Sequence, residues 1–431
     1  MINRFRIQRK LMNISSFIDL VRMNKHYNLY SKSLERKQNR RIRRLMKRAY
    51  NIPFYRERFD STGVKPEDIR NAADLQKLPI LTKDDLRKWM ESESVKPENK
   101  YCFTDTTSGS TGKPLTLLYS PREKANNIAN WLRMMMEVGF NPFFGVTMSR
   151  LDTHGSGEYG VSVIQKIGIL RRVLVDEFAS PEEQVENLNR YKPDFFYINR
   201  SDMFCMCLYC KENGVEVHKP KFYAPIAEKI SEQSEQLFRE VLGDGMVDAY
   251  GSAETGTILV KRPGSSNYYF HNDSYVLNIY DEANHLADEG KVIVTPLFKT
   301  DFPLINYQIG DLVCSHVVNG NRIFTDILGR MNDLFKYENG EVQTFYEIHP
   351  VIASCTDLYQ IRFIQKTYKK LLIQCVKKQN ESGRTKAEIE QYLERALNEH
   401  FKQPFEMDFE WLPVLPPDEH GKLRVLISEV E

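Results

Sequence analysis

Short apolar runs that alternate with helix-length segments are the feature that most limits the folds open to this chain. The runs are DFFYIN at 194–199, GMVDAYG at 245–251 and KVIVTPL at 291–297. Each has the length and the β-branched or aromatic content typical of a strand. Helical patterns are predicted at 181–191, 201–213 and 227–241. This alternation of strands and helices predicts an α/β protein.

The character of the sequence changes after Gly329. Two strands are predicted within 359–378 and one helix within 384–401, and a short strand is expected near the end of the chain. We therefore predict a large α/β body over residues 1–330, with several sheets and flanking helices. A small C-terminal α+β domain is predicted over residues 331–431.

Helix caps can be placed from the residue types at helix starts. A long arginine-rich helix is predicted at 31–50, and Pro53 prevents it from continuing. Thr82 and Ser120 precede segments with acidic residues in the first turn, and Thr385 begins the last helix. Ser and Thr at these positions are expected to accept hydrogen bonds from backbone N–H groups.

Charge is distributed unevenly along the chain. Residues 1–58 contain 17 Lys and Arg but 3 Asp and Glu, whereas the remaining residues contain 43 basic and 55 acidic side chains. A basic arm for nucleic acid or anionic lipid is one interpretation. We favour a basic helical region that packs on an acidic body, and we predict no nucleic-acid partner.

The first 21 residues combine a basic start with apolar residues at helical spacing. Asn13 and Asp19 interrupt the apolar run and no small-residue cleavage site follows, so a secretory signal is not predicted. An amphipathic helix that packs on its own domain is expected, with weak peripheral membrane contact as the alternative. Seven cysteines without framework spacing indicate a reducing compartment, so we predict a cytoplasmic protein.

The stretch TTSGSTGKP at 106–114 lies between two predicted strands. Its glycines let the backbone come close to a polyphosphate, and its N–H groups and hydroxyls supply donors. The spacing is not that of a Walker motif, because two residues separate Gly109 from Gly112 and Pro114 follows the lysine. A phosphate-binding loop is predicted, with a hairpin turn that binds no ligand as the alternative.

Four further motifs follow the loop in order. They are DAYGSAETG at 248–256, NYQIGDL at 306–312, ILGRMNDLFKYENGEVQTFYEI at 327–348 and LPPDEHGKLR at 415–424. With them the chain resembles the adenylate-forming acyl ligases, in particular the phenylacetate–CoA ligase branch and its CapK-like capsule-biosynthesis relatives. The segments NIPFYRERF, LPILTKDDLR and YKPDFFYINRSD extend the resemblance over nearly the whole chain.

The resemblance implies nucleotide-binding roles for these motifs. Adenine would stack on Tyr250 beside Gly251, Asp311 would accept hydrogen bonds from both ribose hydroxyls, and Ser252 or Thr255 would contact the α-phosphate. Glu254 would be a catalytic residue and a ligand of Mg²⁺, which prefers oxygen donors. The loop residues that would hold the β- and γ-phosphates are Thr107, Ser108, Gly109, Ser110, Thr111, Gly112 and Lys113.

The resemblance also implies roles for residues outside the central motifs. Arg330 and Lys336 would contact the nucleotide, and Glu228 matches a glutamate that precedes a helix near the active site. Lys422 would be catalytic, because a cation placed at the α-phosphate stabilises the charge that develops there. The small domain would be mobile and adopt two orientations, one for each half-reaction.

The chain departs from the family pattern at several positions. Ala253 replaces a hydroxyl residue, Ile226-Ala227 replaces a Thr-Gly pair, and Asn306 replaces an arginine before the tyrosine. Asn332 stands at the hinge position, where the family has aspartate or lysine. These departures keep open the alternative of a nucleotide-binding scaffold that has lost catalysis.

Other chemistry-bearing residues have simpler interpretations. Cys205, Cys207 and Cys210 lie in a predicted helix among apolar residues, so core thiols are favoured over a metal site. His271 and Asp273 are interpreted as structural. His154 lies in a glycine-rich segment and is either a loop residue or part of an acyl pocket.

The resemblance implies ATP- and Mg²⁺-dependent activation of a small carboxylic acid to an acyl-adenylate. The acyl group would then pass to coenzyme A or to the pantetheine of an acyl-carrier protein. One alternative is adenylyl or acyl transfer to a cofactor or a glycan precursor, for example in capsule biosynthesis. The acid and the oligomeric state are not predicted by the sequence.

Overall fold

The structure, a computed structural model, describes residues 32–92, 102–106, 115–151, 168–169, 171–176, 179–318, 321–331, 333–378, 383–416 and 423–430. The chain divides into two compact units. The first unit takes the residues up to Gly139 together with Ala249–Ile327, and the second takes Phe140–Asp248 together with Leu328–Glu431. The predicted domains, 1–330 and 331–431, stay a prediction.

Three helices begin the described part of the first unit: α2 (Lys32–Ala49), α3 (Pro53–Asp60) and α4 (Lys83–Glu91). Helix α2 buries Ile42, Leu45, Met46 and Ala49, which recur at helical spacing, so its basic residues fall on the other face. Thr82 caps α4 as predicted, since its side chain accepts a hydrogen bond from the N–H of Asp85.

A seven-stranded sheet forms the centre of the first unit, in the order β10-β11-β12-β13-β9-β8-β7. Its strands are β7 (Asp248–Ser252), β8 (Gly256–Lys261), β9 (Tyr268–Phe270), β10 (Tyr275–Tyr280), β11 (Glu289–Pro296), β12 (Tyr307–Val318) and β13 (Asn321–Arg330). Strands β10, β11 and β12 pair antiparallel, with Tyr275 opposite Pro296 and Val294 opposite Tyr307. The buried faces of these strands join the same hydrophobic core as α2, α3 and α4.

A separate hairpin flanks the predicted phosphate loop. Strands β1 (Phe103–Thr106) and β2 (Thr116–Tyr119) pair antiparallel, and Thr106 stands opposite Thr116. Helix α5 (Pro121–Glu137) follows at once, and Ser120 caps it as predicted. The loop itself, residues 107–113, lies outside the described residues.

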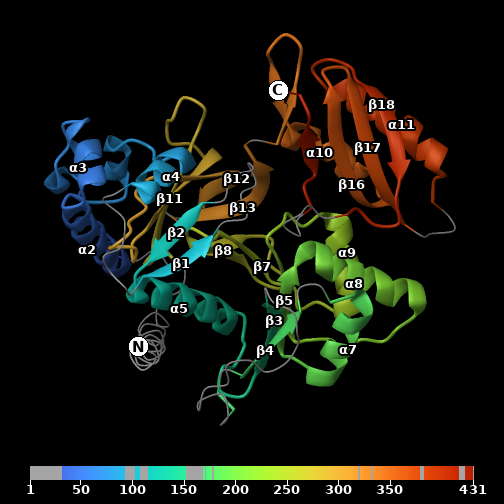
Figure 1. Cartoon of the computed structure of the whole chain (residues 1–431), viewed down its shortest axis with the longest axis horizontal. Coiled ribbons are helices and arrows are strands. Elements are labelled where there is room, and N and C mark those ends of the chain that lie inside the picture. Colours follow the sequence, from blue (N-terminus) through green and yellow to red (C-terminus); the bar gives the residue numbers. More distant parts are fainter. Residues whose placement is uncertain are drawn as a thin grey trace. The chain divides into compact units, whose positions relative to one another are not determined.

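The second unit contains a parallel four-stranded sheet in the order β4-β3-β5-β6. Its strands are β3 (Val146–Leu151), β4 (Arg171–Asp176), β5 (Phe195–Asn199) and β6 (Phe222–Ile226). Helices α7 (Pro181–Tyr191), α8 (Arg200–Asn213) and α9 (Glu232–Leu242) lie beside these strands (Figure 1). The predictions for α7 and α8 are confirmed, but α9 begins at Glu232 rather than at residue 227.

The late start of α9 has a backbone cause. Ala227 has a φ of 73°, in the left-handed region that cannot continue into a right-handed helix. The chain therefore crosses a loop before Ser231, whose side chain caps α9. Glycine would adopt this conformation at lower cost than alanine.

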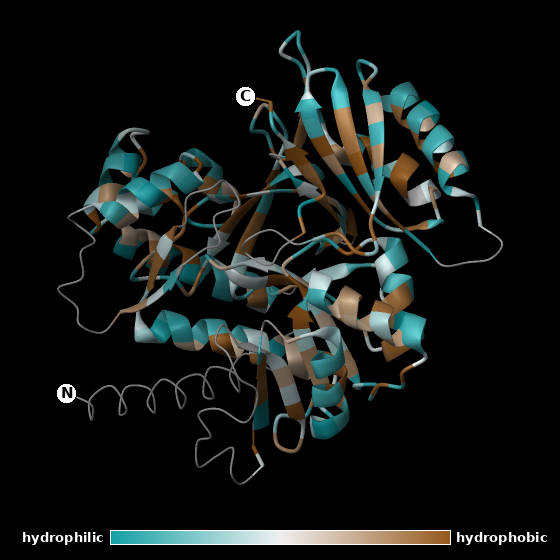
Figure 2. Ribbon diagram, turned by 45° about the vertical axis from the view of Figure 1, so that its right-hand side comes forward, coloured by the Kyte–Doolittle hydropathy of each residue, from teal (hydrophilic) through white to brown (hydrophobic). Residues whose placement is uncertain are grey.

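The rest of the second unit is a four-stranded sheet with two helices. The sheet has the order β18-β17-β16-β19, made of β16 (Leu358–Thr367), β17 (Lys370–Lys377), β18 (Glu406–Trp411) and β19 (Leu426–Ser428). A short pair, β14 (Leu334–Lys336) and β15 (Val342–Thr344), precedes α10 (Phe345–Ser354), and α11 (Lys386–His400) begins after its predicted cap, Thr385. Apolar residues on the strands contrast with the largely hydrophilic surface of α11 (Figure 2).

The predicted α/β class, with several sheets and flanking helices, is confirmed. All seven cysteines are free thiols. Cys207 and Cys210 belong to the core beside the parallel sheet, where burial raises the pKa of both thiols. Within the described ranges, no helix has both the length and the apolar character that crossing a bilayer demands.

Candidate active site

The residues that the sequence assigns to the base and to the sugar are in direct contact. Tyr250, on β7, donates its phenolic hydrogen to Oδ2 of Asp311 on β12, at 2.8 Å. Three strands separate β7 from β12 in the strand order, so the sheet must curve strongly for these side chains to meet. Each carboxylate oxygen has two lone pairs, so Asp311 retains acceptor capacity for hydroxyl groups.

The turn between β7 and β8 carries the next predicted residues. A Cβ on Gly251 would lie 2.1 Å from the carbonyl oxygen of Gly256. The backbone of Gly256 thus leaves no room for a side chain at residue 251, so glycine is required there. The hydroxyl oxygens of Ser252 and Thr255 are 3.0 Å apart and hydrogen-bonded. The segment Ser252–Gly256 is therefore a compact turn, and Glu254 lies at its centre.

Glu254 is buried, with 5% of its surface exposed. Its Oε1 accepts a hydrogen bond from the hydroxyl of Tyr307 at 3.1 Å and lies 3.8 Å from Nζ of Lys83. Burial and the negative charge of Glu254 raise the pKa of Tyr307 above its ordinary value, so the tyrosine stays a neutral donor.

The carboxylate of Glu254 fits a role as a magnesium ligand. Among the described residues, its Oε2 accepts no hydrogen bond, which leaves one anionic oxygen for a cation. The described ranges contain no group of three His, Cys, Asp or Glu residues placed to hold a metal. A single protein carboxylate suits Mg²⁺, which keeps water and takes further oxygens from phosphate groups.

Lys299, which the sequence analysis did not single out, is part of this site. It is 1% exposed, and its Nζ donates to the backbone carbonyl of Glu254 at 3.3 Å. The ammonium lies 3.9 Å from the centre of the Tyr119 ring. Burial lowers the pKa of Lys299 to about 8, although Glu123 and Glu254 act against this shift. A single lysine in TPLFKTDFP carries no signal of burial, because most lysines are exposed.

The open end of the hairpin, opposite the end next to the predicted phosphate loop, also reaches this turn. Tyr119, the last residue of β2, donates its hydroxyl hydrogen to the carbonyl of Ala253. The loop begins beyond Thr106 and ends before Thr116, on the two strands of the same hairpin. The hairpin that carries the loop is thus joined directly to the turn that carries Glu254.

Asn306 does not present its amide to this site. Its φ is 52°, and its Nδ2 donates to the carbonyl oxygens of Leu75 and Leu78 at 2.6 and 3.1 Å. Its own N–H donates to Thr295 at 2.9 Å. Asn306 therefore fixes the start of β12 and so places Tyr307, which follows it.

Glu228 belongs to the second unit. Its Oε1 accepts a hydrogen bond from the hydroxyl of Ser201 at 2.7 Å, and its Oε2 lies 3.9 Å from NH1 of Arg200. Both partners are in the first turn of α8, where a carboxylate is favoured by the helix dipole. The glutamate therefore links the loop after β6 to the start of α8.

Arg330 and Lys336 also lie in the second unit. No described residue accepts a hydrogen bond from the guanidinium of Arg330, which ends β13. The ammonium of Lys336 donates a hydrogen bond to the carbonyl of Val430 at 2.6 Å, so in this structure it binds the backbone after β19. Lys422, Asn332, His154 and residues 107–113 lie outside the described residues, and their roles stay predictions.

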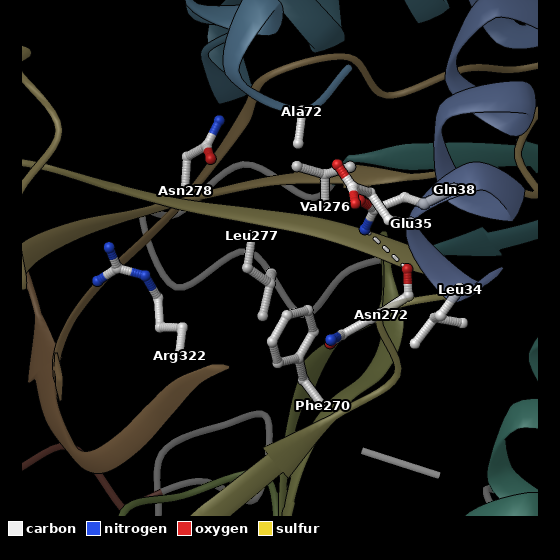
Figure 3. Close-up of a pocket in the computed structure, with 10 residues that line it drawn as sticks. All are labelled: Leu34, Glu35, Gln38, Ala72, Phe270, Asn272, Val276, Leu277, Asn278 and Arg322. Carbon is white, nitrogen blue, oxygen red and sulfur yellow. Dashed lines mark hydrogen bonds between the residues drawn. The ribbon is translucent and has the colours of Figure 1, made fainter. Parts of the chain in front are cut away.

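A pocket of about 170 Å³ lies elsewhere in the first unit, between α2 and the strands β9, β10 and β13 (Figure 3). Leu34, Phe270 and Leu277 give it an apolar lining, and Gln38 donates to the carbonyl of Asn272 at 2.8 Å beside it. Its lining contains none of the residues predicted to bind nucleotide.

Comparisons with known proteins agree with the motif series. The chain is 26% identical to phenylacetate–coenzyme A ligase of Aromatoleum evansii over 326 residues, covering 69% of this chain and 70% of that protein. It is 22% identical to protein CapK of Staphylococcus aureus over 400 residues, covering 88% and 86%. The chain is a relative of the adenylate-forming ligases. No protein-family model matches it.

Solved structures with the same fold include a coenzyme A ligase. A 2-hydroxyisobutyryl-CoA ligase, crystallised with 2-HIB-AMP in its postadenylation state, has a TM-score of 0.75 at 17% identity. The match covers 94% of this chain and 91% of that chain. The predicted resemblance to adenylate-forming coenzyme A ligases is confirmed.

Proposed function

We propose that the protein activates a small carboxylic acid with ATP and then transfers the acyl group to the thiol of coenzyme A, with AMP as the leaving group. The carboxylate would attack the α-phosphate, forming an acyl-adenylate and releasing pyrophosphate. The observation that carries this proposal is the hydrogen bond between Tyr250 and Asp311. The hydrogen bond brings the aromatic ring of Tyr250, which can stack on adenine, close to the carboxylate of Asp311, which can accept hydrogen bonds from both ribose hydroxyls.

The first unit supplies further groups for this chemistry. Glu254 would hold Mg²⁺, which neutralises phosphate charge when bound. Tyr307 keeps the carboxylate of Glu254 in one orientation by its hydrogen bond to Oε1. Lys83 adds a cation close to that carboxylate. We further propose that residues 107–113 hold the departing phosphates, and that Arg330, Lys336 and Glu228 act near the nucleotide.

An acceptor other than coenzyme A is the second candidate. The similarity to CapK spans 88% of the chain, against 69% for the phenylacetate ligase. An acyl or adenylyl transfer to a glycan precursor or a cofactor is therefore kept as the alternative second step. A carrier-protein pantetheine would be recognised through the same thiol chemistry.

Exchange of labelled pyrophosphate into ATP, with a panel of small carboxylic acids, tests the first step. We expect exchange with at least one acid, because adenylation is reversible. Mass analysis of the product with and without coenzyme A then identifies the acceptor. Absence of exchange with every acid would contradict the proposal, and exchange without a thioester would favour the alternative acceptor.

The role proposed for Lys422 has its own test. Lys422→Ala should lower the rate of pyrophosphate exchange by about 10²–10³, the loss expected for one electrostatic stabiliser. Lys369→Ala serves as the control, because Lys369 forms an exposed pair with Glu338 and should have no effect. An unchanged exchange rate in Lys422→Ala would remove this residue from the mechanism.

A further inference from the structure

Three successive backbone carbonyls in the turn that carries Glu254 each accept a hydrogen bond from a buried side chain. Tyr119 donates to Ala253, Lys299 donates to Glu254 at 3.3 Å, and Tyr275 donates to Thr255 at 2.9 Å. The donors come from three separate segments of the first unit. They are the end of β2, the turn after β11, and the start of β10.

These bonds determine the orientation of consecutive peptide planes. Because a peptide unit is planar, holding the carbonyls on both sides of a residue fixes the direction of its Cα–Cβ bond. The residue held in this way is Glu254. The hydroxyl of Tyr307 then donates a hydrogen bond to Oε1 of Glu254 at 3.1 Å, which holds the carboxylate. Backbone and carboxylate of Glu254 are thus both constrained, which leaves Oε2 in one position.

Lys299 is itself held firmly. Its ammonium rests on the ring of Tyr119, 3.9 Å from the ring centre, an arrangement that stabilises a buried cation. The turn that follows Lys299 is anchored by buried Glu123, whose Oε1 accepts the N–H groups of Asp301 and Phe302, both at 2.9 Å. A buried lysine costs free energy, which the contacts with the Tyr119 ring and the Glu254 carbonyl offset.

We propose that Lys299 is a positioning residue for the adenylation reaction. With Tyr119 and Tyr275 it forms a carbonyl clamp that sets the direction of the Glu254 carboxylate, which would hold Mg²⁺ and its phosphates. Tyr119 also connects this clamp to the hairpin of the predicted phosphate loop. The inference rests on the proposed function, since it assigns Lys299 to the site of that reaction.

The decisive variant is Lys299→Met, which keeps the length of the side chain but removes the donor. Pyrophosphate exchange should fall about 10- to 100-fold in kcat, because a buried carbonyl loses its partner and Glu254 loses its fixed orientation. The ratio of the ATP affinity with Mg²⁺ to the ATP affinity without Mg²⁺ should be at least about fivefold lower in the variant than in the wild-type protein. The affinity for AMP without metal should change less than about threefold, since Tyr250 and Asp311 remain.

Further variants separate positioning from folding. Lys299→Arg retains a cationic donor and should restore part of the loss. Tyr119→Phe keeps the ring but removes the bond to Ala253, and should lower kcat about 2- to 10-fold even if Lys299→Met does not fold. Tyr280→Phe, on the same strand as Tyr275 and also buried, is the control and should leave exchange unchanged.

The outcomes divide clearly. Normal kcat and normal Mg²⁺ enhancement in Lys299→Met, or in Tyr119→Phe if the first variant is unfolded, would overturn the clamp. An equal loss of AMP affinity in Lys299→Met would show a general structural defect and also overturn it. If the wild-type protein itself exchanges with no acid, the proposed function fails first and the inference falls with it.

Discussion

At the scale of single residues, Asn306 shows how a change from the family pattern can be structural. Asparagine tolerates a backbone φ of 52° better than most other residues do. Its amide also satisfies two buried carbonyls that an alkyl side chain could not. The sequence showed the substitution but not the direction of the side chain, because that depends on Leu75 and Leu78, over 200 residues away in sequence.

Substitution of Asn306 tests this account. Asn306→Ala should lower the free energy of unfolding by about 2–4 kcal/mol, because two carbonyls lose a donor and alanine is strained at positive φ. Asn306→Gly should recover about 1 kcal/mol, since only the strain is relieved. Asn284 is the control: it has φ of 62° in an exposed turn, and its Oδ1 accepts a long, exposed hydrogen bond from Lys291 at 3.4 Å, so Asn284→Ala should cost about 1 kcal/mol, mainly from the backbone. Equal costs at both positions in denaturant titrations would contradict the account.

The contact between Tyr250 and Asp311 leads to a prediction about ligand binding. Asp311→Asn should weaken AMP binding about 10- to 100-fold, because a charged acceptor for the ribose is lost. Tyr250→Phe keeps the ring for stacking, so its effect should be smaller, about 2- to 10-fold. Calorimetry measures both affinities. Asp326→Asn, on neighbouring β13, is the control, and an Asp311→Asn variant that binds AMP as tightly as this control would argue against a ribose contact.

At the scale of elements, a buried ionic cluster joins α2 and α5 to the start of β10. Arg133 of α5 donates to Asp273 at 2.8 Å, and Lys37 and Arg41 of α2 also face this carboxylate. Burial opposes ionisation of Asp273, but Arg133, Arg41 and Lys37 together lower its pKa to about 2. The structural interpretation of Asp273 agrees with these contacts, which tie three elements of the first unit together.

This cluster predicts how stability depends on pH. The pKa of Asp273 is about 2 in the folded protein, whereas the ordinary value, which applies to the unfolded chain, is 3.8. Ionised Asp273 therefore stabilises the fold above about pH 4, and this stabilisation is lost as the pH falls towards 2. Asp273→Asn should lower the free energy of unfolding at pH 7 by about 3–5 kcal/mol, because Arg133 stays buried without its main partner.

Asp288→Asn is the control for this prediction. Asp288 is 65% exposed and pairs with Arg322, so its loss should cost less than about 1 kcal/mol. Denaturant titrations at pH 7 and at about pH 2, where the Asp273 carboxylate becomes protonated, measure both variants. A cost of less than 1 kcal/mol for Asp273→Asn would contradict a stabilising role for the cluster.

Local structure was largely predictable from the sequence at this scale. Thr82, Ser120 and Thr385 cap their helices because a hydroxyl next to an acidic first turn acts through neighbours only a few residues away. The start of α9 was predicted five residues too early. Its apolar pattern extends over the loop, and nothing in the residue types marks the left-handed backbone of Ala227.

At the scale of the whole molecule, the alternation of strands and helices predicted the α/β class, and the motif series predicted the likeness to adenylate-forming ligases. It also assigned Tyr250 and Asp311 to the nucleotide; the two side chains are hydrogen-bonded to each other, and their nucleotide-binding role stays a prediction. The clamp by Lys299, and the hydrogen bond from Tyr307 to Glu254, could not be predicted. These contacts arise only when a curved sheet brings together strands that are separated in the chain, and single lysines and tyrosines carry no mark of such pairing.

The central claim is that the first unit binds an adenosine between Tyr250 and Asp311, with the phosphates directed towards Glu254. A crystal structure of the protein soaked with ATP and Mg²⁺ measures this directly. The account predicts adenine against the ring of Tyr250, ribose hydroxyls on the carboxylate of Asp311, and a metal ion on Oε2 of Glu254. Nucleotide bound elsewhere, with these three side chains free of ligand, would contradict it.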